Sequence, residues 1–256
     1  MLTGLYEGAL EDARAREIQE PLGDLISRAK SAPEVRGVAG LVPRDQVHII
    51  AEIKRRSPSK GELAPITDPV GLALAYERGG ASVISVLTEE RRFGGSLKDL
   101  EDVSQAVSIP VLRKDFIANE YQIVEARAHG ADLVLLIMAG LADEEVARLL
   151  EITHSWGMEA LVETHSEDEL VRAVNLGARI IGVNARDLTT FELDQELFGR
   201  LQHLMPEGVL KVAESAVVNS QDVTRYREQG AHAVLVGEAL VTGVDPELTV
   251  KEFVEA

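Results

Sequence analysis

The chain has 256 residues, of which 26 are Lys or Arg and 43 are Asp or Glu, so its formal net charge is −17 with histidine neutral. This acidic balance argues against a nucleic-acid-binding protein and against a protein of anionic membrane surfaces, because both need positive potential to hold phosphate groups. The sequence has no Cys, which excludes a disulfide scaffold and a zinc ribbon. We expect one domain, residues 1–256, that is soluble and cytoplasmic, with no secretory signal and no membrane span.

The first 46 residues come before the first expected strand and contain helical patterns over residues 2–18 and 22–29. We interpret residues 1–46 as an N-terminal helical extension. From residue 47 onward, short apolar runs alternate with amphipathic stretches, which is typical of repeated βα units. The expected strands are 47–53, 82–87, 110–113, 133–137, 159–162, 180–183, 210–213 and 233–236.

Helix starts between these strands carry recognisable signals. Asp68 precedes Pro69 as a cap before a first-turn proline, and Ser166 with Glu169 predicts a capping box. Eight βα units in a chain of this length predict a (β/α)8 TIM barrel, with a doubly wound open sheet as the alternative. We expect the extension helices to cover one mouth of this barrel.

In such barrels the catalytic groups lie at the C-terminal ends of the strands. Two lysines, Lys54 and Lys114, and three acids, Glu52, Glu163 and Glu214, fall at expected strand ends. Charges gathered at one mouth shift one another's pKa values, as general acid–base catalysis requires. A structural ring of salt bridges among the same residues is the alternative.

The loops after the last two strands combine small residues with a possible helix N-terminus, a combination that often binds phosphate in this fold. These residues are Ser215, Ala216, Gly237 and Glu238, with Lys54 and Ser57 expected nearby. The pattern favours a phosphorylated small-molecule substrate over ordinary turn geometry.

Other chemistry has less support. The histidines lack metal-ligand spacing, and the segment at residues 94–96 lacks the lysine of a phosphate-binding loop, so we expect neither a metal nor a nucleotide cofactor. Phe93 and Phe116 follow strand ends, where they could either flank an aromatic substrate or pack in the core.

Four motifs of this sequence resemble those of the indole-3-glycerol-phosphate synthase family. They are AEIKRRSPSKG at 51–61, PVLRKDFI at 110–117, GVNARDL at 182–188 and AES at 213–215. The resemblance implies a TIM barrel with an N-terminal helical extension. It also implies a cofactor-free reaction of tryptophan biosynthesis, in which 1-(2-carboxyphenylamino)-1-deoxyribulose 5-phosphate is cyclised, decarboxylated and dehydrated to indole-3-glycerol phosphate.

The resemblance further implies the catalytic roles. Lys114 would be the general acid that protonates the substrate ketone, and Glu163 the acid/base of dehydration. Lys54 would hold the substrate carboxylate and assist proton transfer. Glu52 would orient the lysines, and Asn184 would bind a substrate hydroxyl.

Binding roles also follow from the resemblance. Ser57 and Arg186 would be polar binding groups, Phe93 and Phe116 would border the aniline ring, and Glu214 and Ser215 would lie at the seventh strand end. The backbone near Ser215, Ala216, Gly237 and Glu238 would take the phosphate. The family usually has Gly where this chain has Ala216, which would weaken phosphate binding if the position needs a positive φ.

An anionic substrate would be repelled by the acidic chain, so we expect a local basic mouth. Its members would be Lys54, Arg55, Arg56, Lys60, Lys114 and Arg186. Two alternatives stay open: a related barrel such as phosphoribosylanthranilate isomerase, and a barrel that binds phosphate without catalysis. We expect a monomer, with other tryptophan-pathway enzymes as candidate partners.

Overall fold

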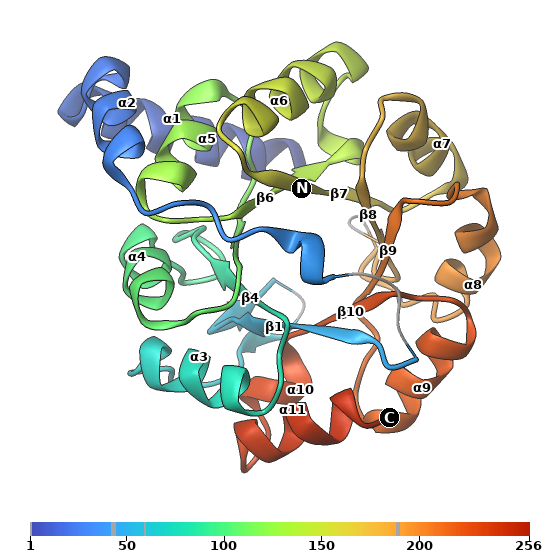
Figure 1. Cartoon of the computed structure of the whole chain (residues 1–256). Helices are drawn as coiled ribbons and strands as arrows, with labels where there is room; N and C mark the ends of the chain where they lie inside the picture. Colours follow the sequence, from blue (N-terminus) through green and yellow to red (C-terminus); the bar gives the residue numbers. More distant parts are fainter. Residues whose placement is uncertain (1, 42–44, 59, 188–189) are drawn as a thin grey trace.

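The computed structural model describes residues 2–41, 45–58, 60–187 and 190–256. Within these residues, eight parallel strands close into a barrel surrounded by helices (Figure 1). Each barrel strand pairs with the next one along the chain, and β1 closes the ring by pairing with both β4 and β10. The barrel strands are β1 (His48–Ile53), β4 (Val83–Leu87), β5 (Val111–Lys114), β6 (Leu133–Ile137), β7 (Glu159–Thr164), β8 (Ile180–Asn184), β9 (Leu210–Glu214) and β10 (Ala233–Val236).

The predicted TIM barrel is therefore confirmed, with every expected strand present and its ends shifted by two residues or fewer. A short antiparallel hairpin, β2 (Arg56–Ser57) and β3 (Gly61–Glu62), follows β1 and was not predicted. The helices that follow the strands are α3 (Pro69–Arg78), α4 (Leu97–Ala106), α5 (Glu120–Ala128), η2 (Met138–Gly140), α6 (Asp143–Ser155), α7 (Glu167–Asn175), α8 (Leu197–Leu201), η3 (Gln202–Leu204), α9 (Ser220–Glu228), α10 (Glu238–Val241) and α11 (Pro246–Val254).

Side-chain caps begin two of these helices as the sequence predicts. Asp68 caps α3 by accepting a hydrogen bond from the Gly71 N–H at 2.8 Å, with Pro69 at the first helical position. Ser166 caps α7 by accepting from the Glu169 N–H. The reciprocal bond of the expected capping box is one residue displaced, because the Glu169 carboxylate accepts from the His165 N–H at 2.8 Å rather than from Ser166. Glu169 is thereby held next to the imidazole of His165.

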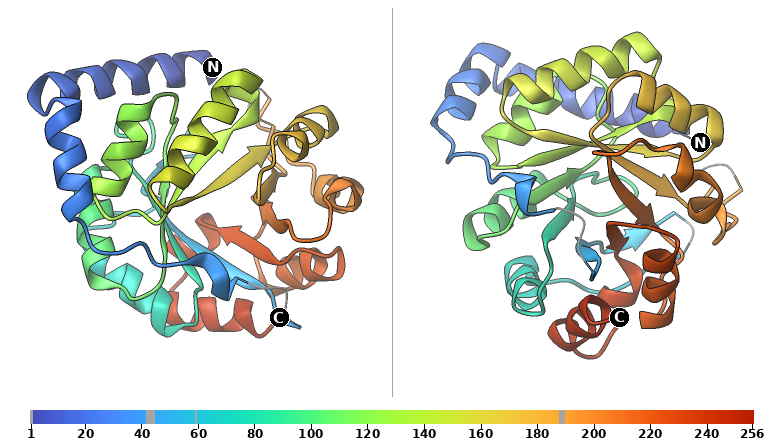
Figure 2. Two further views of the ribbon diagram at one scale, coloured as in Figure 1. Left: turned by 45° about the horizontal axis from the view of Figure 1, so that its top comes forward. Right: turned by 45° about the vertical axis from the view of Figure 1, so that its right-hand side comes forward.

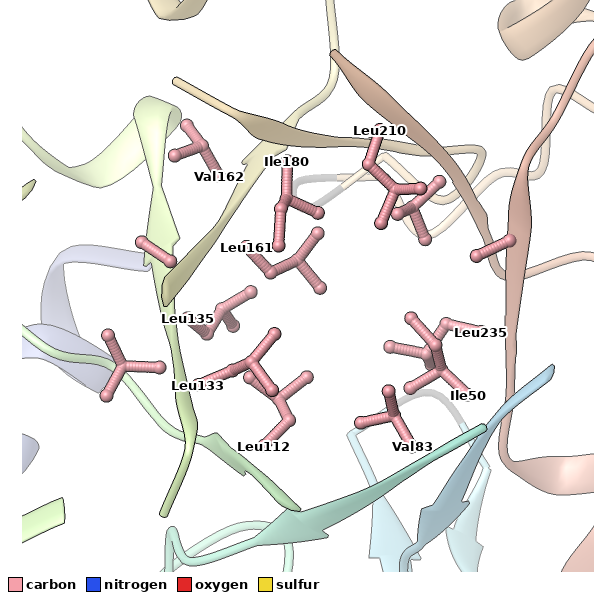
Figure 3. Close-up of a cluster of buried hydrophobic side chains, with 14 of the residues drawn as sticks. Ile50, Val83, Leu112, Leu133, Leu135, Leu161, Val162, Ile180, Leu210 and Leu235 are labelled. Carbon is pink, nitrogen blue, oxygen red and sulfur yellow. The ribbon is translucent and has the colours of Figure 1, made fainter. Parts of the chain in front are cut away.

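The barrel interior is a packed apolar core. Figure 3 shows Leu112, Leu135, Leu161 and Leu235 directed toward the barrel axis from four different strands. All four side chains are buried. Because this layer fills the barrel, polar chemistry is confined to the C-terminal ends of the strands.

The N-terminal extension lies along the side of the barrel (Figure 2). Its helices are α1 (Leu2–Gln19) and α2 (Leu22–Ser31). The apolar face of α2 packs on α5, where Leu25 and Ala29 meet Tyr121 and Val124. Arg16 of α1 forms a two-bond ion pair with Glu125 of α5, at 2.6 and 2.9 Å.

The expectation that these helices cover one mouth holds in part for α1, because Tyr6 and Ala9 of α1 pack into the main core cluster and Tyr6 meets Phe116, which follows β5. It fails for α2, whose apolar face packs on α5 at the barrel's flank. Further along α1, Glu11 and Asp12 pair with Arg91 in the loop after β4, at the C-terminal end of the barrel. The segment after α2, which includes η1 (Val38–Gly40), runs to the opposite end of the barrel. There Arg36 donates hydrogen bonds to the carbonyls of Ser104, Val107 and Gly130.

Candidate active site

A cavity of about 210 Å³ opens at the C-terminal ends of the strands. Its walls come from most of the barrel strands, from the hairpin after β1 and from the first turn of α1. Every residue to which the sequence analysis gave a catalytic, substrate-binding or phosphate-binding role lines it. These residues are Glu52, Lys54, Ser57, Phe93, Lys114, Phe116, Glu163, Asn184, Arg186, Glu214, Ser215, Ala216, Gly237 and Glu238.

Lys114 lies at the charged centre of the cavity. Its Nζ is 3.2 Å from Oε2 of Glu163 and 3.5 Å from Oε2 of Glu214. A second ion pair lies at the end of β1, where Nζ of Lys54 is 2.6 Å from Oε1 of Glu52. A Cβ at Gly237 would come within 2.5 Å of that same Glu52 oxygen, so the position has no room for a side chain.

The environment fixes opposite charges on Lys114 and Glu163. Burial lowers the pKa of Lys114, but the surrounding carboxylates, Glu163 first among them, outweigh burial and raise the pKa above its usual range. Burial raises the pKa of the Glu163 carboxyl, but Lys114 and His165 outweigh it and hold that pKa well below its usual range. At neutral pH the pair is therefore an ammonium and a carboxylate.

Glu214 has the opposite character, although its carboxyl is equally buried. Burial and the nearby Glu163 carboxylate raise the pKa of Glu214 to about 8, against the attraction of Lys114. Two acids in one cavity therefore differ in protonation at neutral pH, one ionised and one largely protonated. Such a separation is typical of sites that need an acid and a base at once.

His165 is a component of the site to which the sequence analysis gave no role. It follows β7, and its Nε2 lies 3.2 Å from Oε1 of Glu163, the oxygen that Lys114 does not contact. Its Nδ1 lies 3.3 Å from Oε2 of Glu169. The spacing offered a signal, because residues two apart along a strand share a face and Glu169 is four residues further on.

Asn184, at the end of β8, connects the side chain of Glu163 with the backbone of Arg186. Its side chain hydrogen-bonds Glu163, and its Oδ1 accepts from the backbone N–H of Arg186 at 3.0 Å. The guanidinium of Arg186 lines the cavity and donates to the carbonyl of Phe191 at 3.3 Å. Arg186 is thus anchored to its own loop at the cavity edge.

Aromatic and aliphatic side chains form the apolar wall of the cavity. The rings of Phe93 and Phe116 are 6.1 Å apart, and Tyr6 of α1 meets Phe116 edge-on at 5.6 Å. Leu2 and Leu5, also from α1, line the cavity beside them. The extension therefore supplies part of this wall, which strand-end reasoning could not find.

The loop after β9 has an unusual backbone. Ser215 and Ala216 both have positive φ, 68° and 57°. Non-glycine residues rarely adopt this conformation, and adopting it costs on the order of 1–2 kcal/mol per residue. The question left open by the sequence is thus answered: Ala216 occupies the left-handed region.

The expected basic mouth is smaller than predicted. Lys54, Lys60, Lys114 and Arg186 line the cavity, and Lys60 pairs with Glu238 at its edge. Arg55 and Arg56 do not line it. Arg55 pairs with Asp99 of α4, and Arg56 pairs with Glu62 of the hairpin. The two arginines instead hold the loop after β1, because each pairs with an acidic residue outside the cavity lining.

The described residues contain no group of three or more His, Asp or Glu side chains placed to hold a metal ion. In the same part of the chain, no helix has the length and apolarity that crossing a membrane requires.

Comparison with known proteins matches the chain to one family. The family model described as indole-3-glycerol phosphate synthase matches residues 2–253. A protein of that name from Leifsonia xyli subsp. xyli is 57% identical over 254 residues, covering 99% of this chain and 97% of the relative. Another of that name from Parafrankia sp. is 52% identical over 255 residues, covering 100% of this chain and 95% of the relative.

Solved structures resemble the chain at the level of fold. A 3-hexulose-6-phosphate synthase superposes with a TM-score of 0.62 at 16% identity, covering 82% of this chain and 98% of that one. The N-acetylmannosamine-6-phosphate 2-epimerase of Clostridium perfringens gives 0.63 at 16% identity, covering 88% and 99%. These similarities support the barrel architecture alone.

Proposed function

The chain belongs to the indole-3-glycerol phosphate synthase family, and we propose how the described cavity carries out that family's reaction. The substrate is 1-(2-carboxyphenylamino)-1-deoxyribulose 5-phosphate. Its ring carbon attacks the ketone carbon, carbon dioxide leaves the ring, and water is lost to give indole-3-glycerol phosphate. The observation that carries the proposal is the Lys114 ammonium, buried at 3.2 Å from Glu163 and 3.5 Å from Glu214.

Lys114 is the general acid of ring closure. As the new carbon–carbon bond forms, negative charge develops on the ketone oxygen, and Lys114 transfers a proton to it to give a hydroxyl group. Loss of carbon dioxide then returns its electron pair to the ring, which restores aromaticity. The raised pKa of Lys114 supports this role, because the group is protonated before the substrate reacts.

Glu163 and Lys54 serve the dehydration. Glu163 is a carboxylate, as a base must be, and takes the proton from the carbon next to the hydroxyl-bearing carbon, while the hydroxyl leaves as water with a proton from the Lys54 ammonium. Before carbon dioxide leaves, Lys54 also holds the substrate carboxylate, and Glu52 orients the lysine across a 2.6 Å ion pair. Asn184 binds a substrate hydroxyl from the same side of the cavity as Glu163.

The two ends of the substrate have different surroundings. Phe93 and Phe116 border the aniline ring on the apolar wall. The phosphate lies at the opposite wall, near the backbone of Ser215, Ala216, Gly237 and Glu238, where successive turn residues can direct N–H groups at an anion. Ser57 and Arg186 are further polar groups for the ribulose chain and the phosphate.

Incubation with the carboxyphenylamino-deoxyribulose phosphate tests this function, with indole absorbance and fluorescence as the readout. We expect turnover to indole-3-glycerol phosphate with release of carbon dioxide. A parallel incubation with phosphoribosylanthranilate addresses the isomerase alternative. Turnover of that compound alone, or substrate binding without any product, would contradict the proposal.

We also propose a cytoplasmic monomer that handles a phosphorylated small molecule. The support for the monomer is that one chain supplies all the described walls of the cavity, including the part from α1. Sedimentation at micromolar concentration tests the oligomeric state, and binding assays with other tryptophan-pathway enzymes test for partners.

A further inference from the structure

We propose that His165 is a positioning residue that holds the Glu163 carboxylate for proton transfer and keeps it ionised. The inference rests on the proposed function and adds to it a chain of three side chains, Glu169, His165 and Glu163. Its first member lies outside the cavity lining and its last lies inside. Neither His165 nor Glu169 touches the cavity, so any effect they have on the reaction passes through Glu163.

The two carboxylate oxygens of Glu163 have different neighbours. Oε2 is 3.2 Å from Nζ of Lys114, on the side of the reacting atoms, whereas Oε1 is 3.2 Å from Nε2 of His165. An acid/base that must meet a substrate hydrogen with one oxygen needs its other oxygen fixed, since small misplacements of a catalytic group are costly. His165 supplies this fixed contact.

Glu169 orients the imidazole from behind. One of its oxygens, Oε2, accepts from the His165 backbone N–H at 2.8 Å and lies 3.3 Å from Nδ1 of the same residue. The backbone bond places the carboxylate whatever the side chain at 165, so the turn does not depend on the imidazole. The side chain of His165 is only 8% exposed, so water competes little for either contact.

Charged groups from several elements surround these three side chains. His165 faces Glu163 of β7 and Glu169 of α7. Glu163 in turn faces Lys114 of β5 and Glu214 of β9, and the phenol of Tyr6 from α1 lies in its field. Burial lowers the pKa of His165, but the two carboxylates that it faces raise it to about 10. A cation at 165 therefore persists at neutral pH and favours the ionised form of Glu163.

Two substitutions separate orientation from charge. His165→Gln keeps a neutral N–H donor that can reach Glu163, whereas His165→Ala removes both donor and charge. We expect kcat to fall roughly 10- to 100-fold in His165→Ala and less in His165→Gln, with KM changed by no more than about two-fold. In both variants the acid limb of the kcat–pH profile moves to higher pH, because Glu163 has lost a neighbouring cation.

His154→Gln is the matched control. His154 also pairs with a glutamate, Glu159 at 3.3 Å, but at the N-terminal end of β7, away from the cavity. We expect wild-type kcat and an unchanged pH profile for it. Unchanged kcat and an unchanged acid limb in folded His165→Gln would overturn the proposal, and so would a loss confined to KM.

Nitrogen NMR of the His165 imidazole in the wild-type protein gives a readout independent of turnover. We expect both ring nitrogens to stay protonated at pH 8, and Glu169→Gln to lower the pH at which they titrate. Titration of wild-type His165 near pH 6.5 would overturn the proposal even if His165→Ala did not fold. The wild-type protein could fail to turn over the substrate while its His165 imidazole stayed protonated by NMR. The proposed function would then fail, but the link between Glu169, His165 and Glu163 would still hold.

Discussion

Gly182 and Glu214 lie on neighbouring strands of the barrel, and the space above the glycine is occupied by the glutamate carboxyl. A Cβ at position 182 would lie 2.0 Å from Oε1 of Glu214 and 3.2 Å from a methyl carbon of Leu161. Glu214 is 1% exposed, so it has little room to move away. The glycine therefore allows a buried carboxyl to reach Lys114.

Gly182→Ala tests this steric relationship. The methyl group forces Glu214 out of its position, and we expect kcat/KM to fall by roughly 10- to 100-fold, because Lys114 loses one of the two carboxyl groups beside it. Gly23→Ala is the control, since no atom lies within 4 Å of a Cβ there. Steady-state kinetics on both variants gives the comparison. Wild-type activity in folded Gly182→Ala would show that the position of Glu214 has no bearing on the reaction.

Ala216→Gly should stabilise the protein. Ala216 has a φ of 57°, which costs a residue with a Cβ about 1 kcal/mol or more and costs glycine little. We expect the free energy of unfolding in urea to rise by roughly 0.5–1 kcal/mol, after the unfolded-state entropy of glycine is offset. Affinity for indole-3-glycerol phosphate, measured by calorimetry, should stay equal or tighten.

Ala32→Gly is the matched control for that substitution, because Ala32 ends α2 with a φ of −67°. Glycine there should lower stability. If both substitutions lowered the free energy of unfolding alike, the left-handed backbone at 216 would carry no strain.

Glu89→Gln tests how the loop after β4 is held. The buried Glu89 carboxylate accepts from three successive backbone N–H groups, those of Arg91, Arg92 and Phe93, at 3.1, 2.7 and 2.9 Å. An amide oxygen can replace only part of this charge-assisted set, so we expect a loss of about 1–3 kcal/mol in the free energy of unfolding. KM should rise as Phe93 shifts. Glu90→Gln, at the exposed neighbouring position, should change neither the free energy of unfolding nor KM. Equal effects of the two substitutions would show that the Glu89 carboxylate does not hold the loop.

The pKa of Glu214 predicts how its contribution to stability depends on pH. Burial and Glu163 raise this pKa from 4.5 to about 8, so the folded state holds the proton more tightly than the unfolded chain. The stability from this difference is fully present below about pH 4.5 and is lost as pH rises through 8. Wild type should therefore lose stability relative to Glu214→Gln between pH 5 and pH 9, by on the order of a few kcal/mol. Urea unfolding at both values measures the change, and a constant difference would contradict the raised pKa.

Strand periodicity predicted the barrel and its site because the two are linked by geometry. Once the strands were assigned, Lys114 and Glu163 had to lie at one mouth, since all parallel strands of a barrel end on the same side. Side chains on different strands could thus be grouped without knowing a single distance.

Other features depended on tertiary packing that no local pattern encodes. Leu2 and Leu5 line the cavity only because of where α1 docks on the barrel, and no periodicity sets where a helix docks. The positive φ of Ala216 was equally unavailable, because alanine has no preference for that region. Arg55 looked like a substrate-binding group until the position of Asp99 was known. His165 was within reach of the sequence, through its spacing from Glu163 and Glu169.

The most direct test of the central claim is the single-turnover rate of Lys114→Ala with the carboxyphenylamino-deoxyribulose phosphate. Removing the ammonium leaves no general acid at the ketone oxygen, so we expect the rate to fall by roughly 10²- to 10⁴-fold, with the barrel folded by circular dichroism. Lys98→Ala, which removes an exposed lysine paired with Asp102 on α4, should keep the wild-type rate. A folded Lys114→Ala protein that formed indole-3-glycerol phosphate at close to the wild-type rate would contradict the assignment of Lys114 as the general acid of ring closure.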